Sequence, residues 1–178
     1  MAKKPTPDRR YYYAGGEKVE LTPADDLLAV DEQALRNLPQ AIEAAVRKRL
    51  RPLSGGVALL HRADLGDQAS GIVQALEAAG ATHPVFRSRG ALVVVLPEVR
   101  VEETRGGAKQ ERLAHWLASH VEDAVVKSRQ EDRLVIEPKS GYGGDALKLA
   151  NQLAEQVDPE MVQARFLRVI PRPSTARG

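Results

Sequence analysis

The order of predicted strands and helices in the second half of the chain is the feature that most constrains its fold. An apolar stretch that begins at Ala91 is suited to a central strand buried on both faces. Two later segments carry apolar side chains at helical spacing, and two others alternate polar and apolar residues around a polar turn. The predicted order is strand, helix, strand, strand, helix, strand, at residues 91–101, 109–120, 121–128, 133–137, 145–156 and 162–170.

The first half of the chain follows nearly the same order. Short apolar segments alternate with segments of helical periodicity, but one strand of the central hairpin has no counterpart. Both halves fit a ferredoxin-like plan, complete as β-α-β-β-α-β in the second unit and lacking one strand in the first. We expect an α+β protein with helices on one face of mainly antiparallel sheets. The predicted elements of the first half are strand 27–30, helix 34–50, strand 57–61, helix 67–79 and strand 82–87.

A hairpin is predicted ahead of the two units. Three tyrosines, Tyr11 to Tyr13, lead through a Gly15-Gly16 turn into an alternating segment that ends at Leu21. We expect residues 1–10 to be a disordered tail and residues 172–178 to be flexible. The predicted domains are residues 11–88, which hold the hairpin and the first unit, and residues 89–171, which hold the second unit.

Composition narrows the class of protein. The chain has 178 residues, and 43% of them are hydrophobic, which suffices for a buried core. It has no cysteine, so disulfides and thiolate metal ligands are excluded. The sequence contains neither an apolar run of about 18 residues nor a signal-peptide core after its basic N-terminus. We therefore expect a cytoplasmic protein with no membrane partner.

The charge is nearly balanced, with 26 basic and 24 acidic residues and a net charge of +2. Basic residues gather between Arg47 and Arg51 and at Arg87 and Arg89, where they could contact phosphates. Aromatic residues make up only 4% of the chain, which is few for a base-stacking surface. A solvated helix face and a loop explain the basic residues more simply than a nucleic-acid site.

The chain lacks a recognisable catalytic or metal-binding pattern. His115 and His120 are about 500° apart around one helix, so they do not share a face that could bind a metal. His61 and His83 end predicted strands, where we expect structural, hydrogen-bonded histidines. The glycine-rich turn before the last helix does not match a phosphate-binding loop, and Asp145 is the predicted N-cap of that helix. We expect no cofactor.

Two stretches of the sequence carry a series of loosely matched motifs. The first runs from Arg10 to Val30 and contains the aromatic run, the Gly-Gly-Glu turn and the Leu-Leu-Ala-Val strand. The second contains residues 83–86, residues 92–100, the helix from Asp145 to Leu153 and the strand from Val162 to Arg168. Through the shared order of these motifs, residues 10–171 resemble the N-terminal prodomain region of bacterial subtilisin-like serine proteases. The last strand departs from the family pattern because it has no Pro-Asp pair.

The resemblance implies a domain that helps a subtilisin-like protease to fold and inhibits it, acting in cis or in trans. Such a domain lays its sheet on helices of the enzyme and threads its C-terminal tail through the active-site cleft. The nucleophile, histidine and aspartate motifs of the protease are absent from this sequence, so we expect no enzymatic activity. The predicted protease-contacting tail is Leu167, Arg168, Val169, Ile170 and Pro171.

Two other functions fit the same pattern. An interaction or scaffold module could form a homodimer or larger homo-oligomer through exposed sheet edges. A ferredoxin-like nucleic-acid binder could use the basic residues at 47–51 and 87–89. These alternatives predict different partners, namely a protease, a second copy of the chain, or RNA or DNA.

Overall fold

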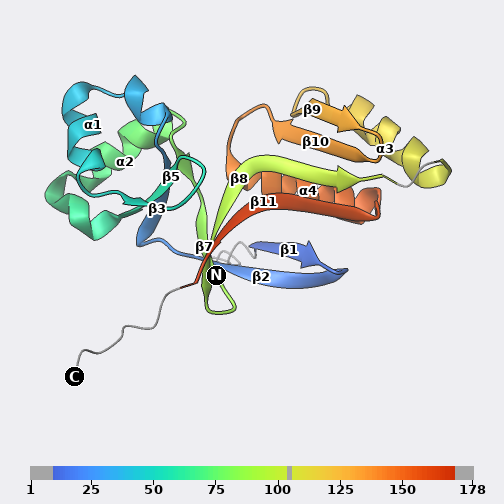
Figure 1. The fold of residues 1–178 in the computed structure, drawn as a ribbon, viewed down its shortest axis with the longest axis horizontal. Helices are drawn as coiled ribbons and strands as arrows, with labels where there is room; N and C mark the ends of the chain where they lie inside the picture. Colours follow the sequence, from blue (N-terminus) through green and yellow to red (C-terminus); the bar gives the residue numbers. More distant parts are fainter. Residues whose placement is uncertain (1–9, 104–105, 171–178) are drawn as a thin grey trace, which may run out of the picture.

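The computed structural model describes residues 10–103 and 106–170, which form two antiparallel sheets and four α-helices (Figure 1). The α+β class predicted from the sequence is therefore confirmed. The smaller sheet lies in the first half of the chain and the larger sheet spans both halves. No helix in the described ranges is long and apolar enough to cross a membrane.

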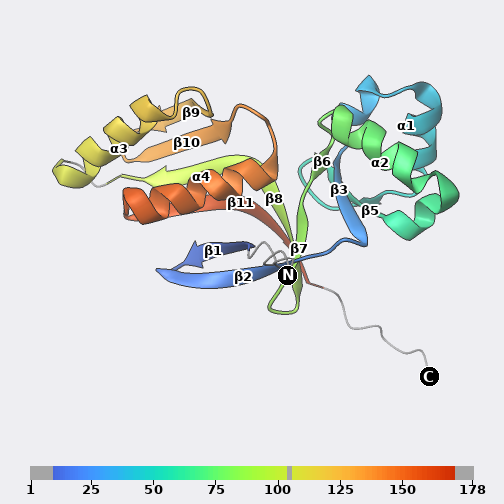
Figure 2. The same cartoon turned by 180° about the vertical axis from the view of Figure 1, so that it is seen from behind.

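The second half of the chain forms most of the larger sheet. Its strands β8, β9, β10 and β11 lie in the order β11-β8-β10-β9, and every pairing among them is antiparallel. Helices α3 and α4 cover one face of this sheet (Figure 2), where Leu113 and Leu153 pack against Val99 and Leu134. The elements are β8 (Ala91–Glu102), α3 (Ala108–Ser119), β9 (Ala124–Gln130), β10 (Arg133–Pro138), α4 (Gly143–Gln156) and β11 (Met161–Val169).

The first half forms the smaller sheet with the strand order β4-β5-β3-β6, again antiparallel throughout. The strand that we expected to be missing is present as the two-residue strand β4, which pairs with β5. The prediction of a lacking strand is therefore wrong, because a strand this short leaves no alternating pattern in the sequence. The elements are β3 (Leu27–Asp31), α1 (Gln40–Arg47), β4 (Arg51–Pro52), β5 (Val57–His61), α2 (Ala69–Ala78) and β6 (Thr82–His83), with 3₁₀ helices η1 (Ala34–Asn37) and η2 (Arg62–Gln68).

The predicted N-terminal hairpin is confirmed as β1 (Arg10–Ala14) and β2 (Glu17–Pro23). Gly15 and Gly16 both have positive φ, at 58° and 84°, which is the backbone that a tight two-residue hairpin turn requires. The hairpin does not extend the smaller sheet, although we grouped it with the first unit. It joins the larger sheet through β7 (Val85–Ser88), and Tyr12 is buried in the core below α4.

The segment predicted as one strand from Thr82 to Arg87 is two strands in different sheets. Strand β6 pairs with β3 in the smaller sheet, whereas β7 pairs with β2 and β8 in the larger one. Pro84 lies between them, and proline has no N–H with which to continue a ladder. The chain therefore crosses from one sheet to the other at Pro84.

The two units contact each other through apolar side chains. Ala29 and Leu59 on the face of the smaller sheet that turns away from α1 and α2 pack in one cluster with Val94 and Leu96 of β8. Because the other face of β3 and β5 packs under the helices, both faces of the smaller sheet are buried. The first unit thus covers one end of the helix-free face of the larger sheet, and no element among residues 10–103 and 106–170 covers the other end.

Candidate protein-docking face

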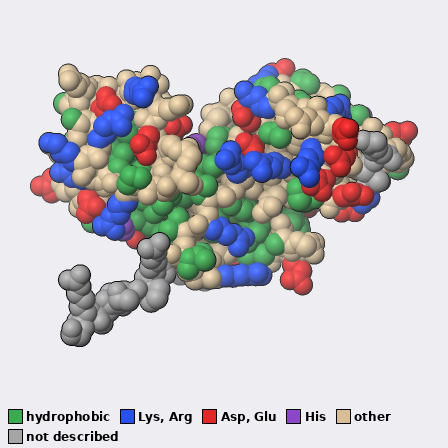
Figure 3. Space-filling view, viewed as in Figure 1, with side chains coloured by type: hydrophobic (Ala, Val, Ile, Leu, Met, Phe, Trp, Pro, Cys, Tyr) green, Lys and Arg blue, Asp and Glu red, His purple; other side chains and the backbone are tan. Residues whose placement is uncertain are grey.

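The uncovered end of the larger sheet is the surface best suited to bind another protein. Along β8, Val99 and Val101 point into the core under the helices, so Arg100 between them points to the opposite face. On β10 the same alternation sends Glu137 to that face beside the buried Ile136. Figure 3 shows basic side chains gathered in a row over this part of the sheet. We call it the docking face, and its charged residues are Glu98, Arg100, Glu102, Lys127, Arg133, Glu137 and Arg165.

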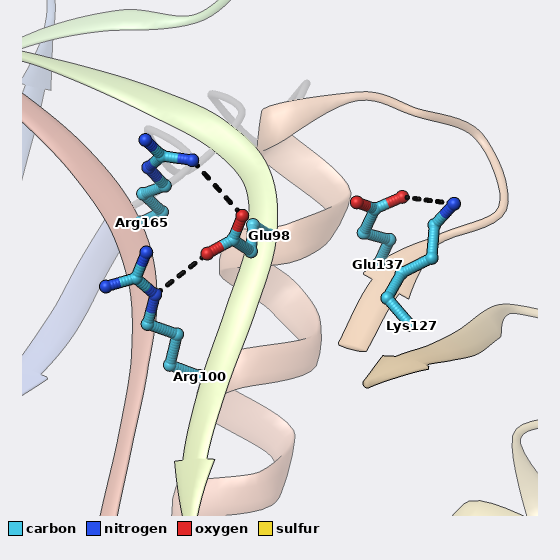
Figure 4. Close-up of polar contacts among 5 residues, drawn as sticks. All are labelled: Glu98, Arg100, Lys127, Glu137 and Arg165. Atoms are coloured by element: carbon cyan, nitrogen blue, oxygen red, sulfur yellow. Dashed lines mark hydrogen bonds and ion pairs between the residues drawn. The ribbon is translucent and has the colours of Figure 1, made fainter. Parts of the chain in front are cut away.

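Ion pairs hold the charged side chains of the docking face across the strands (Figure 4). Glu98 accepts hydrogen bonds from Arg100 at 2.8 Å and from Arg165 at 3.2 Å, so one carboxylate binds two guanidinium groups. Lys127 lies 3.3 Å from Glu137. Exposed pairs of this kind add little stability, about 0–1 kcal/mol each. The arrangement leaves a surplus positive charge between β8 and β11.

A break in strand pairing positions Glu98 at this place. Ala164 lies opposite Val99 and Phe166 lies opposite Val95, so three residues of β8 face Arg165 alone. Pro97 is at the centre of these three residues, and it cannot donate a ladder hydrogen bond. The resulting bulge brings the side chains of Glu98 and Arg165 together from neighbouring strands.

The predicted protease-contacting tail is divided between the sheet and the chain end. Leu167, Arg168 and Val169 belong to β11 and lie opposite Val94, Val93 and Leu92 of β8. Arg168 also donates a hydrogen bond of 2.7 Å to the Tyr12 hydroxyl. Ile170 follows the strand and is 78% exposed, whereas Pro171 lies outside the described residues. Of the predicted tail, therefore, only Ile170 is seen to be free of the sheet.

The tyrosine run forms a hydrogen-bonded cluster with α4. The hydroxyls of Tyr11 and Tyr13 donate to the same Glu155 oxygen at 2.6 and 2.9 Å, and the Lys18 ammonium lies 4.5 Å from the Tyr11 ring centre. The hydrogen bond to Glu155 raises the pKa of Tyr11 to about 12. The hydrogen bonds from Tyr11 and Tyr13 lower the pKa of Glu155. The cluster fastens the hairpin to the helix.

Two of the four histidines, His120 and His83, pack against other residues of the protein. His120 stacks on Trp116 with ring centres 4.0 Å apart, and its Nδ1 lies 2.8 Å from the Trp116 carbonyl oxygen. His83 is buried, and burial lowers its pKa. The expected hydrogen bond is missing at its Nδ1, which has no partner within the described part of the chain. Residues 10–103 and 106–170 contain no group of histidine and acidic side chains that could hold a metal.

The glycine-rich turn before α4 serves close packing. A Cβ at Gly143 would overlap the backbone carbonyl of Val95, so glycine lets the helix approach β8. Tyr142, rather than Asp145, is the N-cap, and the prediction for Asp145 is wrong. Asp145 instead accepts a hydrogen bond of 2.7 Å from Ser140 in the preceding turn.

The two predicted basic regions are partly neutralised by neighbouring acids. Arg47 donates to Glu43 at 2.8 Å, one turn earlier on α1, and Arg49 donates to the Ala45 carbonyl. Arg87 pairs with Asp26 at 2.8 Å. That hydrogen bond raises the pKa of Arg87 and lowers the pKa of Asp26.

Comparisons with known proteins found no matching family model, no similar curated protein and no similar solved structure. The docking face therefore has to be interpreted from its own geometry. The sequence does not reveal this face, because Arg165 meets Glu98 only through the bulge. Alternation after Pro97 was the one available signal, since it places Glu98, Arg100 and Glu102 on a single strand face.

Proposed function

We propose that this chain is a non-catalytic, prodomain-like module that binds a subtilisin-like serine protease, helps it fold or inhibits it. In this proposal the docking face lies against the enzyme, and the segment that follows Ile170 enters the active-site cleft. The resemblance of residues 10–171 to such prodomains supplies the identity of the partner. The uncovered, charged sheet face supplies a surface for it.

The order of the strands in the two sheets is the observation that most supports the proposed prodomain-like function. In each unit, the strands numbered in chain order lie as 4-1-3-2 with antiparallel pairing, as β11-β8-β10-β9 and as β6-β3-β5-β4. This is the order of a ferredoxin-like β-α-β-β-α-β unit, so we interpret the fold as two such units in tandem. A sheet with helices on one face and a free second face is suited to docking on helices of a partner.

The route of the chain end supports a role for the tail. Eight of the nine residues of β11 have register partners on β8, so the point at which the chain leaves the sheet is held firmly. Exposed Ile170 is the first residue beyond that point. An extended segment there can pair with the edge of a cleft, although Pro171 and Pro173 remove two N–H donors.

The test is to add the purified chain to an active subtilisin-like protease and measure peptide hydrolysis and complex formation. We expect inhibition, and Arg100→Glu should weaken the complex about tenfold because it reverses a charge on the docking face. Lys148→Glu, on the exposed side of α4, is the matched control and should leave affinity unchanged. Removal of residues 171–178 should reduce inhibition more than binding. If neither inhibition nor a complex occurs, the proposal fails.

A homodimer is the second candidate, and one observation favours it. Strand β9 is an edge strand whose Val125 and Val126 are 40% and 45% exposed. Exposed apolar edges are sites where two copies of a chain can pair. Light scattering that gives a dimer mass, reduced to a monomer by Val126→Lys, would favour this function over protease binding.

A further inference from the structure

The outer edge of β11 is open. In the described part of the chain β11 pairs with β8 alone, and its other edge faces the β1–β2 hairpin without strand pairing. Figures 1 and 2, which view the molecule from opposite sides, both place β1 beside β11. An unpaired strand edge presents N–H and C=O groups that can accept a further strand.

Two hollows flank this edge. One, of about 600 Å³, lies between the hairpin turn at Gly15 and Gly16 and residues 158–163. The other, of about 620 Å³, lies over Arg100 and residues 163–168 on the docking-face side. Met161 and Gln163 line both hollows, so the two meet at the first half of β11. We call the combined hollow along Met161–Arg165 the edge groove.

The electrostatics of the second hollow favour an acidic occupant, whereas two acidic residues, Asp158 and Glu160, line the first hollow. Arg100, Arg165 and Arg168 line the second hollow, and no acidic side chain lines it. The side chains of Arg100 and Arg165 remain 58% and 45% exposed although both bind Glu98. Two guanidinium groups that share one carboxylate leave a positive charge, which a second carboxylate would neutralise.

We propose that the edge groove binds an extended, acidic peptide segment of another protein, which adds to β11 as a strand. Backbone hydrogen bonds to Met161–Arg165 would provide the affinity, and carboxylates over Arg100 and Arg165 would provide the specificity. This site shares Arg100 and Arg165 with the docking face, but the addition of a strand to β11 does not depend on which protein carries the segment. It therefore goes beyond the proposed protease function.

Neither this chain's own ends nor a second copy fits as well. Residues 1–9 and 171–178 together contain five basic residues and one acidic residue, so their charge opposes binding near Arg165. A second folded copy would bring its own hairpin to the same edge. The hairpin turn already forms one wall of the edge groove, so the hairpin of a second copy would compete with it for the same edge.

The test uses fluorescence anisotropy with three labelled ten-residue peptides and the full chain. The first peptide alternates glutamate and valine, the second alternates lysine and valine, and the third is the first with N-methyl groups on alternate backbone nitrogens. We expect the glutamate peptide to bind at least about tenfold more tightly than the lysine peptide, because like charges repel across the groove. N-methylation on the pairing edge should also cost about tenfold, because it removes backbone donors.

Charge-reversal variants locate the site. Arg165→Glu and Arg100→Glu should each weaken binding of the glutamate peptide about tenfold. Lys48→Glu makes the same change in charge at the exposed end of α1 in the first unit, away from the edge groove, and should leave binding within about twofold. Circular dichroism checks that each variant is folded. The proposal would be overturned if all three variants lost affinity for the glutamate peptide equally, or if the N-methylated peptide bound as tightly as the glutamate peptide. It would also be overturned if the chain formed a dimer through β11 that excludes the peptide.

Discussion

The two units have the same connectivity and strand order but differ in strand length, and this difference separates their roles. In the second unit β8 has twelve residues and β11 has nine, whereas in the first β3 has five and β6 has two. The short apolar strands of the first unit are buried on both faces. The long strands of the second extend beyond the area that the first unit covers. The extra length exposes the docking face.

The comparison of the two units also explains where the charged side chains of β8 lie. Near the first unit, Val94 and Leu96 on β8 are apolar because they contact Ala29 and Leu59. After Pro97 the residues on the same face become Glu98 and Arg100. The first unit is therefore buried against the second through apolar contacts, and the second carries the charged surface that we propose for docking.

The largest expected effect comes from disrupting the contact between the units. Val94→Asp should lower the free energy of unfolding by about 3 kcal/mol or more, because the carboxylate would be buried between apolar side chains. Val126→Asp on exposed β9 is the matched control and should cost within about 0.5 kcal/mol. Urea unfolding followed by circular dichroism measures both. Similar losses in the two variants would show that the units do not depend on their contact.

Equivalent core residues test whether the units unfold together. Leu60 of β5 and Leu134 of β10 are fully buried on the third strand of each unit, and replacing either with alanine should cost about 2–5 kcal/mol. Trp116 is the only tryptophan of the chain and lies in the second unit. Because the units share a core cluster, we expect Leu60→Ala to shift the Trp116 fluorescence transition as well. If Leu60→Ala shifted the unfolding transition measured by circular dichroism but not the one measured by Trp116 fluorescence, the first unit would unfold independently of the second.

Replacing a glycine with alanine near the start of the second helix of each unit, α2 or α4, should change the free energy of unfolding in opposite directions. Gly143→Ala in α4 should cost about 1–3 kcal/mol, because the new methyl group overlaps the Val95 carbonyl and the helix must move. Gly71 in α2 has open space around it, so Gly71→Ala should stabilise the protein by about 0.5–1 kcal/mol. Thermal unfolding of both variants checks the signs. Two changes of the same sign would contradict the packing difference between α2 and α4.

The smallest effect concerns the cluster that joins the hairpin to α4. Tyr11 has its pKa raised to about 12, so its contribution to stability is complete below pH 10 and is lost as pH rises through about 12. The pKa of Glu155 is lowered, so its contribution is present above the ordinary glutamate range and is lost as pH falls through the lowered value. Glu155→Gln should return the pKa of Tyr11 toward 10.0. Ultraviolet titration of tyrosinate measures this, with Glu17→Gln as a control that should not change it.

Local patterns were sufficient to predict most strands and helices. The apolar runs at Leu27 and Val57 and the Gly15-Gly16 turn are found where expected. The prediction was wrong at β4, which is too short to leave a pattern, and at Asp145, which accepts a hydrogen bond from Ser140 in the preceding turn. It was also wrong at Pro84, where pairing with strands distant in sequence divides one predicted strand between two sheets. The docking face could not be predicted, because Arg165 reaches Glu98 from 67 residues away through a bulge.

The sequence by itself determined the α+β class, the two similar units and the hairpin turn, because these follow from periodicity and from the backbone freedom of glycine. Only the tertiary structure decided that the hairpin joins the larger sheet, that Leu167 to Val169 are held within β11, and that one end of the larger sheet stays uncovered. The physical reason is that strand pairing and face covering depend on contacts between distant segments. A local pattern predicts which side of a strand is apolar, but it does not predict which distant segment of the chain covers that side.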